Sequence, residues 1–179
     1  MTRLALILAL VCCGCGAAEQ PKWAVTVAAY EVPLPTTADK ARFLNLVRVK
    51  SEAQGFHVDA ATPHELDVLS EVSPMTFSAS VWRGENDEET IASAMDFEDR
   101  IGRVRLSFPL GQDPARSARF RTAVVPEIKK IWPSTRSLPI MPNGAIPLTE
   151  DLVRTPLGYT VNPSAAAKYN DESRKHIVR

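Results

Sequence analysis

The alternation of apolar and polar residues predicts four strands in the first two thirds of the chain. Trp23–Val32 is rich in β-branched and aromatic residues, and prolines at positions 33 and 35 end this run. Period-two alternation predicts further strands over Thr76–Arg83, Thr90–Phe97 and Arg103–Phe108. The connections between these last three runs are short and polar, which favours an antiparallel three-strand meander.

Apolar residues spaced by three or four predict a long helix over Ala38–Gln54, with threonines before it as N-cap candidates. A shorter helix is predicted over Pro63–Ser70. Its start carries two signals, because Thr62 and Glu65 have the spacing of a capping box and proline occupies the first helical position.

A second long helix is predicted to begin after Asp113, which is followed by a proline, and to end at Trp132. Pro126 lies inside it and lacks a backbone N–H, so we expect a kink or a restart near Val125. The Pro-rich segment Ser137–Leu148 is apolar but unsuited to a central strand. We expect it to run extended over the domain or along a sheet edge.

These elements predict an α+β fold: an antiparallel sheet of three to four strands packed on two main helices, with a Pro-rich extended C-terminal segment. With 179 residues, of which 45% are hydrophobic, the chain is long enough for one sizeable core. We expect a single domain over residues 23–160 and a flexible C-terminal tail over residues 161–179.

The charge balance and the missing motifs exclude several classes of function. The chain carries 21 Lys or Arg and 21 Asp or Glu, which argues against a nucleic-acid partner. The glycines form no phosphate-binding loop, and the histidines at 57, 64 and 176 have no paired-ligand spacing. The acidic run from Glu85 to Glu89 lacks the spacing of a calcium loop and is interpreted as a solvated turn. We expect no cofactor and no bound metal.

The first residues have the pattern of an export signal. Arg3 precedes Leu4–Val11, an apolar run of eight residues, whereas a membrane-spanning helix needs about 20. The chain's three cysteines, Cys12, Cys13 and Cys15, all follow this run. The domain itself therefore contains no disulfide and no thiolate metal site.

A cysteine directly after such a run resembles the lipobox of bacterial lipoproteins. That family has Leu three residues before the modified cysteine and a small residue directly before it. Cys15 follows Gly14 but has Cys12 at the Leu position, whereas Cys13 has Leu10 at the right distance but follows Cys12. We take Cys15 as the lipidation site, with Cys13 as the alternative.

The resemblance implies a signal peptide over residues 1–14 and a lipidated linker over residues 15–22. It also implies acyl chains on Cys15 that attach the protein to membrane lipid. Residue 16 is Gly and not the Asp that retains such proteins at the inner membrane, so the resemblance implies the outer membrane, facing the periplasm. Ordinary secretion is the alternative, since Gly16-Ala17-Ala18 fits a cleavage signal and would give a soluble periplasmic protein.

Two surfaces are candidates for binding. Arg103 and Arg105 share one face of their strand, and Ser78, Ser80 and Trp82 share one face of another. Trp and Arg are enriched at recognition sites, so these five residues are the predicted binding patch if the helices cover the opposite face. The second candidate is basic residues on the second long helix, interpreted as a solvated face or as a contact for an acidic partner or anionic lipid: Arg116, Arg119, Arg121, Lys129 and Lys130.

We expect a non-enzymatic envelope lipoprotein that binds another envelope protein or an envelope component, for example as an assembly or immunity factor. The alternative is an envelope hydrolase that acts on peptidoglycan or a lipid through carboxylates or His57, although the sequence lacks a G-x-S-x-G motif. A purely structural envelope protein is the third hypothesis.

Overall fold

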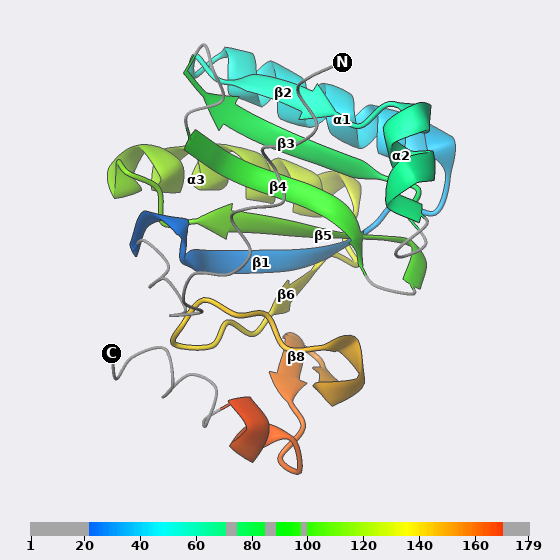
Figure 1. Ribbon diagram of the computed structural model, residues 1–179, viewed down its shortest axis with the longest axis vertical. Helices are drawn as coiled ribbons and strands as arrows, with labels where there is room; N and C mark the ends of the chain where they lie inside the picture. The colour runs from blue at the N-terminus through cyan, green and yellow to red at the C-terminus, as the bar shows by residue number, and fades with distance from the viewer. Residues whose placement is uncertain (1–21, 71–74, 85–88, 98–99, 170–179) are drawn as a thin grey trace, which may run out of the picture.

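The computed structural model describes residues 22–70, 75–84, 89–97 and 100–169, and within these ranges the protein is an α+β fold (Figure 1). The strands are β1 Thr26–Pro33, β2 His57–Ala60, β3 Ser78–Arg83, β4 Glu89–Phe97, β5 Arg100–Pro109, β6 Arg136–Leu138, β7 Leu152–Thr155 and β8 Gly158–Val161. The helices are α1 Thr37–Glu52, α2 Pro63–Ser70 and α3 Pro114–Ile131, with two 3-10 helices, η1 Lys22–Ala24 and η2 Thr149–Asp151.

The predicted size and composition of the sheet are wrong. The described strands form one eight-stranded sheet in the order β2-β3-β4-β5-β1-β6-β8-β7, not three or four antiparallel strands. The sheet is mixed, because β6 and β8 pair in parallel while the other neighbours are antiparallel. The meander of β3, β4 and β5 is confirmed, and β1 joins it beside β5.

The starts of the first two helices follow their sequence signals. Thr36 caps α1, since its side chain accepts a hydrogen bond from the backbone N–H of Asp39 at 3.0 Å. The capping box of α2 is also confirmed: the hydroxyl of Thr62 accepts from the N–H of Glu65, whose carboxylate accepts from the N–H of Thr62. Each cap satisfies backbone donors that have no partner inside the helix.

The start of α3 is confirmed, but the predicted interruption at Pro126 is wrong. Asp113 caps the helix by accepting from the N–H of Arg116 at 3.0 Å, and one helix continues to Ile131. Pro126 lies on the exposed side of α3. The residues on either side of it in the apolar stripe, Val124 and Ile128, are each 1% exposed, so burial on both sides of the proline outweighs its local cost.

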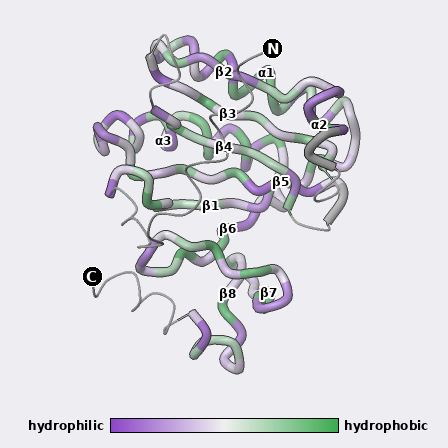
Figure 2. The backbone as a smooth tube through the Cα atoms, in the orientation of Figure 1, coloured by the Kyte–Doolittle hydropathy of each residue, from purple (hydrophilic) through white to green (hydrophobic). Residues whose placement is uncertain are grey.

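Both long helices pack on the same face of the sheet, behind it in Figure 1. Figure 2 shows that both helices contain hydrophobic and hydrophilic positions, and the buried residues of each recur every three or four positions. Phe43 of α1 and Phe120 of α3 are fully buried in one core with residues of β3, β4 and β5. The helices are antiparallel: Phe120, near the start of α3, stacks edge-on to Phe56, just after α1, while Trp132 donates to Asp39 near the start of α1.

A second, smaller core lies under the C-terminal segment, which Figure 1 shows below the larger part of the sheet. It joins Ala29, Phe97 and Leu138 to half-buried apolar residues of the last third of the chain. The first two residues of the Pro-rich segment belong to β6, which lies between β1 and β8, so the sheet-edge alternative is wrong. Further along, Ile140 and Ile146 pack on the smaller core, in line with the alternative that the segment runs over the domain. Tyr169 is buried there, and its hydroxyl donates to the carboxylate of Asp151.

Candidate functional site

One face of the sheet is not covered by α1 and α3, and it faces the viewer in Figure 1. Alternate residues of β3, β4 and β5 that point toward the helices, such as Ala79, Ala94 and Leu106, are buried in the main core. The residues between them point the other way and are half-buried. We call these the open face: Ser78, Ser80, Trp82, Thr90, Ser93, Met95, Arg103, Arg105 and Ser107.

The open face therefore contains all five residues of the predicted binding patch. The strand register also shows which of them are neighbours. Ser80 of β3 lies opposite Ser93 of β4, which in turn lies opposite Ser107 of β5. The hydroxyls of Ser93 and Ser107 are 2.8 Å apart and share a hydrogen bond. A row of three small hydroxyl side chains thus forms a low polar floor across the middle of the open face.

A second row crosses the sheet two residues further along. It runs from Ser78 of β3 through Met95 and Arg105 to Glu31 of β1. The guanidinium of Arg105 donates to the sulfur of Met95 at 3.1 Å. Trp82 lies four residues along β3 from this row, or about 13 Å away at the usual rise of a strand. The tryptophan and the arginines therefore share a face without touching, at opposite ends of the serine floor.

Glu31, which is buried beside the open face, is a residue that the sequence analysis missed. Its side chain is 0% exposed although it carries a carboxylate. Arg103 contacts one carboxylate oxygen at 2.9 Å, and the hydroxyl of Tyr159 donates to the other. Arg105 and Arg136 lie opposite Glu31 on its two neighbouring strands, but their guanidinium groups donate to the sulfur of Met95 and to the backbone oxygen of Thr155. A buried carboxylate needs partners such as Arg103 and Tyr159, because desolvation disfavours its charge.

One sequence signal pointed to Glu31. It has the same parity as Ala29 in an otherwise apolar strand, and a charge at an inward position of such a strand indicates a paired buried group. Its partners Arg103 and Tyr159 are 72 and 128 residues away. No local pattern connects residues that far apart.

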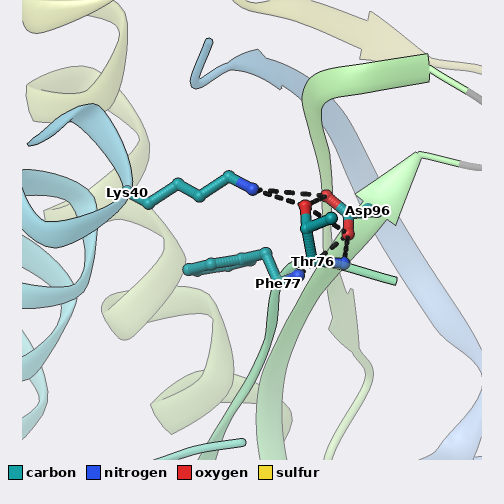
Figure 3. A network of polar contacts seen from close by, with 4 residues as sticks. All are labelled: Lys40, Thr76, Phe77 and Asp96. Carbon is teal, nitrogen blue, oxygen red and sulfur yellow. Dashed lines mark hydrogen bonds and ion pairs between the residues drawn. The ribbon is translucent and has the colours of Figure 1, made fainter. Parts of the chain in front are cut away.

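A network on the helix side joins α1 to the sheet (Figure 3). The ammonium of Lys40 donates to the hydroxyl of Thr76 at 2.6 Å and lies 3.8 Å from the carboxylate of Asp96. That carboxylate also accepts from the backbone N–H groups of Thr76 and Phe77. The hydroxyl of Thr76 accepts from Lys40 and donates to Asp96, so the network ties the start of α1 to the turn that leads into β3.

Glu89 corrects the interpretation of the acidic run as a solvated turn. Its side chain is 1% exposed and pairs with Arg83 at 2.6 Å. Its other oxygen accepts from the backbone N–H of Gln112, so it ties the start of β4 to the loop before α3. The other acidic residues of the run lie outside the described residues.

The candidate hydrolase residue His57 lies on an edge strand and does not line the cavity found in the described part of the chain. His57 and Asp59 are exposed on β2, an edge strand. A cavity of about 10 Å³, large enough for one water molecule, lies instead on the helix side of the sheet and is lined mainly by apolar residues of α1 and the strands. Among the described residues no group of His, Cys, Asp or Glu is arranged to hold a metal ion.

The predicted lipidation sites, Cys15 and Cys13, lie outside the described residues, as does the whole predicted leader. None of the helices in the described ranges has the length and apolar character needed to cross a membrane. No protein-family model matches the sequence, and no curated protein is similar to it.

Proposed function

We propose that the protein is a lipid-anchored protein of the bacterial envelope whose domain binds another envelope protein through the open face. The anchor is Cys15, and the domain lies on the periplasmic side of the outer membrane. The leader pattern supports the location, and the arrangement of Trp82 and Arg105 on the sheet face opposite α1 and α3 supports the binding role.

The open face has the chemistry of a recognition surface. Its serine floor is flat and polar, so a partner's strand or loop can lie on it with its backbone groups hydrogen-bonded. Trp82 at one end offers a large apolar contact, and Arg105 at the other presents a planar guanidinium that also donates to Met95. Recognition needs only this surface, whereas catalysis needs a nucleophile or acid–base pair in an enclosed site.

The location is tested on the mature N-terminus. Mass spectrometry should find an acylated Cys15, and Cys15→Ala should release the protein from membranes. An unmodified N-terminus at Glu19 would establish the secreted soluble form instead. Acylation of Cys13 would move the anchor by two residues and leave the rest of the proposal intact.

The binding role is tested by crosslinked pull-down from the envelope fraction, comparing Trp82→Ala with Trp23→Ala. Trp23 is 40% exposed but lies in η1, away from the open face, so it is a matched control. Loss of a tryptophan at a recognition hot spot weakens binding by about 2 kcal/mol, or about 30-fold. We expect the Trp82→Ala variant to lose the partner and the Trp23→Ala variant to keep it. Equal recovery of a specific partner by both variants would refute the role of this face.

A further inference from the structure

The charges of the protein are separated between its layers although the chain as a whole is neutral. α1 and α3 together contain nine Lys or Arg residues and three Asp or Glu. By difference from the chain totals of 21 and 21, the rest of the sequence has 12 basic and 18 acidic residues. The helical layer is therefore strongly basic, and it covers one face of the sheet.

Five basic side chains of this layer are exposed, although the ammonium of Lys129 also lies over the ring of Tyr30 on β1. The exposed ones are Arg42 and Arg48 on α1, and Arg119, Lys129 and Lys130 on α3. Within the part of the chain that the structure describes, none of these five makes an ion pair. Of the three acidic residues on α1 and α3, Glu52 is exposed and the other two are half-buried.

The antiparallel packing of the helices spreads these charges over one surface. Arg42, near the start of α1, lies over the ring of Trp132 at the end of α3, close to Lys130 in the sequence. At the other end of the layer, the end of α1 approaches the start of α3, which carries Arg119. We call this surface, with its five exposed cations, the basic helical face.

The position of the N-terminal segment indicates what this face meets. The backbone oxygen of Trp23 accepts from the N–H of Gly111 at 2.9 Å, and α3 begins three residues later. The described chain thus starts beside the N-terminal end of α3. Lys22 follows Cys15 by seven positions, and a chain of that length spans at most about 25 Å. An acylated Cys15 would therefore hold this end of α3 within about 25 Å of the lipid headgroups.

We infer that the basic helical face lies against the anionic lipid headgroups of the membrane that carries the anchor. This inference rests on the proposed anchor at Cys15. Basic side chains near an anionic leaflet each strengthen the attraction by about fivefold. The short tether keeps the nearer end of the basic helical face, with Arg119, within a few Debye lengths of the leaflet. The open face is on the other side of the sheet, so this docking turns it away from the membrane and toward the periplasm.

The test uses the native acylated protein in vesicles, with a fluorescent label and a headgroup quencher. Cleavage of the leader before Cys15 removes Cys12 and Cys13, so an introduced cysteine is the one unmodified thiol. Thr122→Cys places the label on the exposed side of α3, and Asp59→Cys is the matched control on β2. We expect strong quenching at residue 122 and weak quenching at residue 59 when the vesicles contain phosphatidylglycerol.

In pure phosphatidylcholine the two positions should be quenched equally. Adding Arg119→Glu and Lys130→Glu to Thr122→Cys should lower the ratio of docked to undocked protein by about tenfold or more. Raising the salt concentration to about 0.5 M should also lower the ratio of docked to undocked protein, because it shortens the screening length. Equal quenching at both positions in anionic vesicles, or no effect of the two reversals, would overturn the inference.

Two further outcomes separate this inference from the proposed function. If Cys15 proves not to be acylated, the anchor fails, and co-sedimentation of the processed protein with phosphatidylglycerol vesicles then tests the basic helical face alone. If a photocrosslinker at residue 122 captures an acidic protein while lipid does not quench the label, the face belongs to a protein partner and the lipid assignment is refuted.

Discussion

Tyr159 and Glu31 are 128 residues apart in the chain, yet the hydroxyl of one donates to the buried carboxylate of the other. Tyr159 lies on β8 and Glu31 on β1, with β6 between them in the sheet. This contact ties the C-terminal hairpin to the strand that borders the open face. Stability of the C-terminal part and order at the open face are therefore coupled through one carboxylate.

Tyr159→Phe should lower the free energy of unfolding by about 1.5–3 kcal/mol, the usual value for a hydrogen bond to a charged group. The measurement is urea denaturation followed by fluorescence. Tyr30→Phe is the control, because the Tyr30 side chain packs on Phe108 and makes no hydrogen bond within the described ranges. Equal destabilisation by both variants would contradict this role of Tyr159.

Arg103→Met should cost about 3 kcal/mol, because it takes a guanidinium away from a fully buried carboxylate. Arg154→Met, at an exposed position on β7, should cost less than about 0.5 kcal/mol. Adding Glu31→Gln to Arg103→Met should restore part of the loss, since the unpaired charge is then gone. A strictly additive double variant would show that the two residues do not act as a pair.

Gly111→Ala should destabilise the protein more than Gly55→Ala. Both residues have φ between 70 and 80°, where a β-carbon costs about 1–2 kcal/mol. At Gly55 the new atom would meet nothing within 4 Å, whereas at Gly111 it would lie 2.1 Å from the hydroxyl oxygen of Ser117. The clash should add about 1–3 kcal/mol in thermal or urea unfolding. Equal losses of stability in the two variants would show that the loop before α3 accommodates the new β-carbon without cost.

The carboxylate of Asp151 should contribute to stability in acid. Its hydrogen bond from Tyr169, and then that from Lys168, hold the pKa of Asp151 below its ordinary value of 3.8. A lowered pKa means that the contribution is fully present above the unfolded pKa and is lost as the pH falls through the folded pKa. Burial and the bond to Asp151 raise the pKa of Tyr169, so this hydroxyl keeps its proton throughout that range.

Asp151→Asn should therefore lose less stability than the parent protein when the pH is lowered from about 4 to about 2. Urea midpoints at each pH measure this difference. Asp67→Asn, at an exposed position on α2, is the control and should follow the parent. The same acid dependence in Asp151→Asn and the parent would exclude this carboxylate as a source of acid sensitivity.

Local signals were enough to predict the elements that carry their own caps and periodicity. Thr62 and Glu65 marked the start of α2, and Asp113 marked the start of α3. Strands of three or four residues, such as β6 and β8, are too short to show an alternation. Their extended conformation is set by pairing with strands that formed elsewhere, which is why the sheet was predicted at half its size or less.

The candidate site was predictable as two separate strand faces but not as one surface. Alternation placed Ser78, Ser80 and Trp82 together, and likewise Arg103 and Arg105. Only the register between β3, β4 and β5 shows that the two groups are on the same side and that Trp82 is remote from the arginines. Register depends on contacts across strands, which a single sequence does not reveal.

The place of β1 in the sheet has a consequence for biogenesis. Both of its neighbours, β5 and β6, are encoded later in the chain, so this strand leaves the ribosome, and any export channel, well before its hydrogen-bonding partners. Until residues beyond Pro109 have followed, Thr26–Pro33 is an apolar ribbon with two unpaired edges. Such a nascent segment is prone to aggregate, and it requires either a holding chaperone or fast delivery of the remaining chain.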